Sequence, residues 1–202
     1  VENGIFQLVK VAFSSIVAMF GTYQIAANGV AQSIWSLAAL VGSAMGPVFI
    51  TVIGQCMGAK DVDQAKFYFS KLIKWSLVFS IVWTLLVLAI TPFILQFYNL
   101  ADETKHLIII LVIIHNIANT VVFPLSGPLS QGLRATGDVK FTMIVSIAST
   151  VGGRLVLSII LALGLHLGVI GIALAMCGDW TIRAIIFYYR YKSNAWTKFE
   201  VI

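Results

Sequence analysis

The sequence contains little charge. Asp, Glu, Lys and Arg make up 10 per cent of its 202 residues, and none of them falls between residues 11 and 59. Hydrophobic residues make up 59 per cent, which is more than a soluble domain of this length can bury, because burial is limited by the ratio of surface to volume. The composition therefore excludes a soluble globular domain and indicates an integral membrane protein.

Cysteine is also scarce. Cys56 falls in a connection and Cys177 within an apolar stretch, so a disulfide framework is not expected. No metal-binding spacing and no glycine-rich phosphate loop occurs, so we expect no metal and no cofactor. The nearest approach to a membrane serine hydrolase is Ser126 with His115, but that serine lies between two prolines and has no nucleophile motif. The sequence therefore predicts no enzyme.

What the chain has in abundance is long apolar stretches. Six are present, at about 1–20, 23–53, 69–93, 107–129, 141–163 and 169–188. About 20 apolar residues cross a bilayer as a helix, and lipid offers no partner to an open backbone. A membrane barrel would show strands of about ten residues with alternating polarity, which are absent. The sequence predicts an all-α, six-transmembrane-helix bundle forming a single domain over 1–202, with a kink at Pro47. Since the chain starts at Val1 inside an apolar stretch, we interpret its first helix as truncated.

The basic residues fall on every second connection between these stretches. They are Lys60 and Lys66, then Arg134 and Lys140, then Arg190, Lys192 and Lys198. The other connections have no base or are net acidic. The positive-inside rule places the basic connections and both chain ends in the cytoplasm, and we expect a multi-pass protein of the plasma membrane. The formal charge of +5 would meet anionic lipid heads, so no nucleic acid partner is needed to explain it.

Three stretches carry a family signature. Residues 52–61 read VIGQCMGAKD, residues 132–142 read GLRATGDVKFT, and residues 168–176 read GVIGIALAM. Together and in this order, they resemble the multidrug and toxic compound extrusion (MATE) transporters, the first stretch being similar to the signature after the second helix of each lobe. Read physically, Gly54 and Gly58 share one helix face and predict close approach of another backbone, and Asp61 or Asp63 is expected to cap the following helix.

The resemblance implies an architecture and an activity. Family members have twelve helices in two six-helix lobes, and this chain looks like the C-terminal lobe. The expected partners are the lipid bilayer, a small organic substrate, a coupling cation and the missing N-terminal six-helix lobe. The implied activity is a secondary active antiporter that exports drugs or other organic, often cationic, compounds. A lipid-linked or polysaccharide flippase of related architecture, and a non-transporting membrane fragment or scaffold, remain alternatives.

The expected coupling cation is H+ rather than Na+. Sodium-coupled members of the family place carboxylates inside their seventh and tenth helices. The counterpart of the tenth helix has no Asp or Glu between His106 and Leu133. A sodium site of that kind is therefore not expected.

Polar side chains at membrane depth are costly and mark candidate sites. The candidates for substrate or ion binding are Glu2, Gln7, Asn28, Gln32, His115, Asn116 and Asn119. Glu2 is the carboxylate of the first span and is expected to take up a proton or to face a cationic substrate. A position at the membrane interface or pairing with Lys10 is the alternative for Glu2, and bonding across the bundle is the alternative for the others.

Three further charges lie within the last two spans. Asp179 and Arg183 are four residues apart on one helix and are expected to pair, and the long side chain of Arg154 is expected to reach Asp179. Buried charges that find partners usually hold elements together. We interpret the three as a structural charge clamp between the fifth and sixth spans, with a proton relay as the alternative.

The predicted orientation can be tested by chemical labelling. Cysteines introduced at Lys66, Arg134 and Arg190 are expected to resist a membrane-impermeant thiol reagent in intact cells, because all three positions are predicted to face the cytoplasm. Labelling of these positions from outside would contradict the orientation.

Overall fold

The chain folds entirely as helices in a computed structural model that describes residues 2–199, apart from the side chains of residues 2, 3, 5 and 6. Its elements are α1 (Glu2–Ala18), α2 (Thr22–Ala38), α3 (Leu40–Gly58), α4 (Val62–Gln96), α5 (Asp102–Ser126), α6 (Pro128–Ala135), α7 (Val139–Ala148), the π-helix η1 (Ser149–Leu155), α8 (Val156–Ser158), the π-helix η2 (Ile159–Gly164), α9 (Gly168–Lys192) and the 3₁₀-helix η3 (Ala195–Lys198). The described range contains no strand, so the predicted all-α fold is confirmed.

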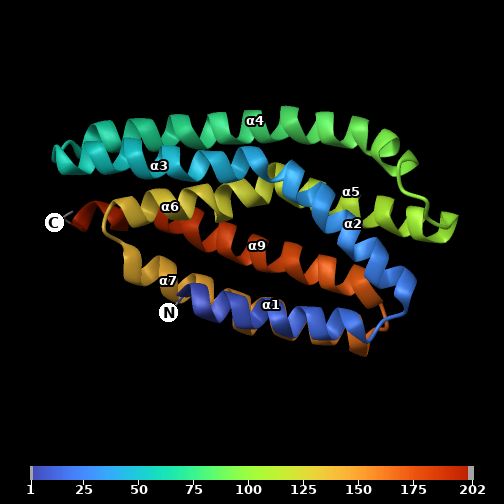
Figure 1. Cartoon of the computed structure of the whole chain (residues 1–202). Coiled ribbons are helices and arrows are strands. Elements are labelled where there is room, and N and C mark those ends of the chain that lie inside the picture. The colour runs from blue at the N-terminus through green and yellow to red at the C-terminus, as the bar shows by residue number, and fades with distance from the viewer. Residues whose placement is uncertain (1, 200–202) are drawn as a thin grey trace.

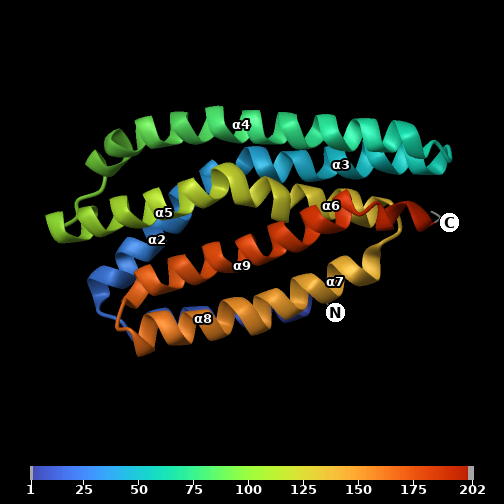
Figure 2. The ribbon, with the colours of Figure 1, turned by 180° about the vertical axis from the view of Figure 1, so that it is seen from behind.

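The long helices run side by side along one direction (Figure 1). Within the described residues, five stretches are long and apolar enough to cross a membrane: Leu40–Gly58, Val62–Gln96, Asp102–Ala135, Val139–Gly164 and Gly168–Lys192. The first predicted span corresponds to α1, whose apolar part Gln7–Ala18 is shorter, and the second to α2 and α3 together. Seen from behind, α7, α8 and the π-helices form one continuous rod (Figure 2).

The connections separate into two groups at opposite ends of the bundle. The α3–α4 and α6–α7 connections and the C-terminal end of α9 lie at one end, and the α1–α2, α4–α5 and η2–α9 connections lie at the other (Figure 1). All of the basic connections identified in the sequence therefore belong to one end. This arrangement is what the positive-inside pattern requires.

The second predicted span is interrupted at Ala39, and the interruption is hydrogen-bonded. Trp83 Nε1 of α4 donates to the carbonyl of Leu37 at 2.9 Å, and Asn119 Nδ2 of α5 donates to the carbonyl of Ala38 at 3.0 Å. These side chains replace helical partners that lipid cannot supply. Pro47 lies inside α3, where it removes one backbone donor without ending the helix, so the kink at Pro47 stays a prediction.

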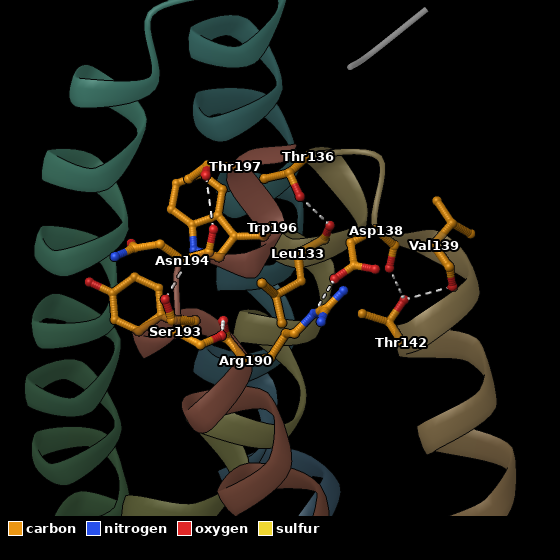
Figure 3. Close-up of polar contacts among 11 residues, drawn as sticks. Leu133, Thr136, Asp138, Val139, Thr142, Arg190, Ser193, Asn194, Trp196 and Thr197 are labelled. Atoms are coloured by element: carbon orange, nitrogen blue, oxygen red, sulfur yellow. Dashed lines mark hydrogen bonds and ion pairs between the residues drawn. The ribbon is translucent and has the colours of Figure 1, made fainter. Parts of the chain in front are cut away.

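The α6–α7 connection is tied to α9 by an ion pair (Figure 3). Arg190 Nε donates to Asp138 Oδ2 at 2.8 Å, and the Arg190 guanidinium lies 4.4 Å from the centre of the Phe141 ring. Asp138 follows Gly137, whose φ of 93° is a conformation that suits glycine. The glycine and aspartate of the second signature stretch therefore make a turn and anchor it.

Asp61 confirms one prediction from the first signature stretch. Its side chain accepts from the backbone N–H of Gln64 at 2.9 Å and so caps α4. The predicted close helix approach at Gly54 and Gly58 is wrong for the described residues, because a Cβ at either position would meet nothing within 4 Å.

Among the glycines of the described residues, Gly171 of α9 has the closest approach to a neighbouring backbone. A Cβ at Gly171 would lie 2.6 Å from the backbone nitrogen of Ala162 and 2.6 Å from the carbonyl carbon of Leu161. Backbone cannot move aside as the tip of a side chain can. The glycine of the third signature stretch therefore sets the distance between α9 and the rod that carries the π-helices.

We expect Gly171→Ala to lower the melting temperature of the full-length protein, because overpacking costs about 1–3 kcal/mol. The matched control is Gly54→Ala, where space is open and alanine favours the helix by about 1 kcal/mol. Thermal unfolding in detergent, followed by tryptophan fluorescence, measures both. Equal melting temperatures for the two variants would contradict the close approach.

Candidate substrate cavity

A cavity of about 620 Å³ lies among α1, α2, α5, η1 and α9. This volume falls within the roughly 300–1,000 Å³ that small-molecule sites occupy. The cavity is bounded by two irregular parts of the bundle: α2, which ends at the Ala39 break, and η1, the first π-helix. Irregular helices in transporters often mark the substrate site.

Aromatic rings form one wall of the cavity. Trp35 and Trp180 are stacked with their ring centroids 5.3 Å apart, and Phe123 meets Trp180 edge-on at 5.3 Å. Trp35 lies in the last turn of α2, immediately before the break. The bonds that Trp83 and Asn119 make to the carbonyls at the break therefore also fix the position of this wall.

Two of the predicted binding residues reach the cavity. Asn28 and Gln32 lie one turn apart on α2, and both line it. Gln7 is exposed on α1 and is not part of the lining. The side chain of Glu2 lies outside the described residues, so its role stays a prediction.

The three predicted candidates on α5 are buried between helices instead. Asn116 Nδ2 donates to the carbonyl of Val112 at 2.8 Å, and Asn119 Nδ2 bonds the break described above. His115 is fully buried behind the aromatic wall, with its ring centroid 6.4 Å from that of Trp35. The structure therefore places these polar groups in helix packing, and the α5 residue that lines the cavity is the aromatic Phe123.

The buried charges connect the first π-helix to α9. Arg183 Nη2 donates to Asp179 Oδ2 at 2.8 Å, and Ser149 Oγ donates to Asp179 Oδ1 at 2.6 Å. Ser149 is the first residue of η1. The link between the two elements is thus made by a serine hydroxyl, a group that the sequence interpretation did not include.

Arg154 is not a member of this ion pair, although it is close enough to interact electrostatically with Asp179. Among the described residues, no ion pair joins Arg154 to Asp179, and its guanidinium lies over the Phe13 ring at 4.7 Å from the centroid. Arg154 lines the cavity together with Lys10 of α1. Sequence reasoning placed Arg154 in the clamp and treated Lys10 only as a partner for Glu2, although a lone lysine in an apolar stretch is itself a signal.

Comparison with known proteins agrees with this architecture. The sequence matches the family MatE over residues 1–160. The chain belongs to the MatE family of membrane transporters. The relatives that it resembles are described as transporters.

Individual relatives show how much of the MatE architecture is present. The "uncharacterized transporter YisQ" of Bacillus subtilis is 23% identical over 197 residues, which is 95% of this chain and 42% of that protein. A solved MOP superfamily transporter from Pyrococcus furiosus, described as having a binding pocket of reverse polarity that suggests a different function, superposes with a TM-score of 0.88 at 18% identity. It matches all of this chain, which covers 44% of it.

A second solved structure gives the same fold. An outward-facing multidrug resistance MATE family transporter of the MOP superfamily superposes with a TM-score of 0.82 at 18% identity, over 99% of this chain and 44% of that one. The chain thus spans less than half the length of the relatives it matches. This extent is consistent with one lobe of a two-lobed transporter.

The role of Asp179 in holding η1 to α9 can be measured. We expect Asp179→Ala to destabilise the full-length protein by roughly 3 kcal/mol, because it leaves Arg183 without its partner in a largely buried position. The double variant with Arg183→Leu is expected to recover part of that loss. Equal melting temperatures for the single and double variants would show that the pair contributes no coupling.

Proposed function

We propose that this chain is the C-terminal lobe of a secondary active antiporter that exports organic compounds by rocking of two lobes. The observation that carries the proposal is the cavity of about 620 Å³ bounded by an interrupted helix and a π-helix in a lobe of the MatE family. Such discontinuous helices at the substrate site are a feature of transporters that alternate access. The basic end of the bundle would face the cytoplasm.

The coupling cation that we propose is H+. A sodium ion requires several oxygen ligands from the protein. In α5 no carboxylate follows Glu103, and both carboxylate oxygens of the buried Asp179 accept hydrogen bonds from Ser149 and Arg183. The described part of the lobe thus offers no free membrane-embedded carboxylate to sodium.

The transport activity can be tested on the full-length protein in proteoliposomes. A panel of anionic, neutral and cationic aromatic dyes would be used, with a proton gradient or a sodium gradient imposed across the membrane. We expect at least one dye to move with the proton gradient, to stop when a protonophore collapses it, and to ignore the sodium gradient. Movement that follows sodium alone would contradict the coupling.

A matched pair of variants assigns the activity to the cavity. Trp35→Leu removes one ring of the aromatic wall and is expected to lower dye transport severalfold, since a stacked aromatic contact contributes about 1 kcal/mol. Leu85→Ala lies on α4, where Leu85 is 62% exposed outside the cavity, and is expected to leave transport unchanged. Absence of dye movement from the folded full-length protein would favour a scaffold.

A further inference from the structure

The charge that lines the cavity is basic. Among the described residues of the lining, the charged ones are Lys10 and Arg154. We infer that the cavity binds an organic anion, an inference that rests on the proposed function and names its substrate class. A cationic compound, which the family resemblance suggested, would meet like charge here, and close like charges in a site of low polarity repel strongly.

The nearby acid offsets only part of this charge. Asp179 is fully buried, accepts from Arg183 and Ser149, and is not part of the lining. The described charges in and beside the cavity are thus three bases, Lys10, Arg154 and Arg183, with one acid. Asp179 attracts Arg154 as well as Arg183, but one acid among three bases leaves the sum positive, and the bases that line the cavity are Lys10 and Arg154.

The surroundings of Arg154 suit a side chain that binds an anion. It lies in the π-helix η1, and π segments inside helices are frequent at functional sites. The Phe13 ring lies under its guanidinium at 4.7 Å, a contact that orients the side chain. Its Nε is buried and has no hydrogen-bond partner among the described residues, although unsatisfied buried donors are costly. An anionic oxygen would supply that partner.

The other residues of the lining indicate the shape and polarity of the rest of the ligand. The stacked rings of Trp35 and Trp180 present a flat apolar face, and aromatic groups bind such faces by stacking. Asn28 and Gln32 supply amide groups for a polar substituent. The chemistry that fits is a carboxylate, sulfonate or phosphate joined to a flat or otherwise apolar body of drug size. A free organic solute and an anionic lipid both contain this combination.

The test measures binding to the full-length protein in a neutral detergent by fluorescence polarisation. The probes are fluorescein, an anion, and rhodamine 123, a cation with the same three-ring skeleton. We expect fluorescein to bind at least tenfold more tightly, and Lys10→Glu to weaken fluorescein binding about tenfold or more, since a charge-assisted hydrogen bond contributes roughly 1.5–3 kcal/mol. Arg154→Lys, which keeps the charge but removes the Nε donor, is expected to retain part of the affinity and to bind fluorescein more tightly than Lys10→Glu does.

Lys74→Glu is the matched control, because Lys74 is an exposed lysine of α4 outside the lining. It is expected to leave both affinities unchanged, and a melting curve for each variant verifies folding. Glu2→Gln is expected to preserve or increase fluorescein binding. Tighter binding of rhodamine 123, equal binding of the two dyes, or no change on Lys10→Glu in a folded protein would overturn the inference.

Two further experiments distinguish a lipid from a free solute as the occupant, and the anion site from the proposed function. In nanodiscs, phosphatidylglycerol that lowers the fluorescein affinity of the wild type but not of Lys10→Glu would identify a lipid as the occupant, whereas no effect would identify a free solute. Binding needs no ion gradient. A protein that binds fluorescein without gradient-driven transport therefore supports the anion site and contradicts the proposed function. A protein that transports rhodamine 123 and binds it more tightly than fluorescein supports the proposed function and contradicts the anion site.

Discussion

The arrangement of this lobe depends on one constraint, that a backbone carbonyl in a lipid bilayer must find its hydrogen bond inside the protein. The interruption at Ala39 frees the carbonyls of Leu37 and Ala38, and they accept from Trp83 and Asn119. The donors belong to α4 and α5, so a break in one span is stabilised by two others. Because Trp35 lies directly before the break, the same bonds position the aromatic wall of the cavity.

Charged groups at membrane depth must likewise find their partners inside the protein. Asp179 would be costly alone at membrane depth, but Arg183 and Ser149 satisfy both of its carboxylate oxygens. The serine begins the π-helix that also carries Arg154, so the ion pair that stabilises α9 also fixes the start of the segment that turns Arg154 toward the cavity. Asp179 forms its ion pair with Arg183 and attracts Arg154 from further away, so one acid faces two arginines and the lining stays basic.

The sequence predicts the parts of this structure that depend on long or local patterns. Apolar runs and alternating basic connections identify the helices and the two ends of the bundle, and Asp61 was recognisable as a cap from its place before α4. The cavity was harder to predict because it depends on distant contacts. Nothing local distinguishes Asn119, which bonds the break, from Gln32, which lines the cavity. No proline marks Ala39, where hydrogen bonds from two other helices stabilise the interruption.

The proposed coupling and the proposed substrate charge together determine how the membrane potential acts on transport. If one proton enters while one organic cation leaves, no net charge crosses the membrane, and only the pH gradient drives export. If one proton enters while one organic monoanion leaves, two charges move in the direction that an inside-negative potential favours, each worth about 2.3 kcal/mol per 100 mV. A basic cavity with Lys10 and Arg154 in its lining would thus make transport sensitive to potential as well as to pH. The charge of the cavity therefore decides which gradient supplies most of the driving force.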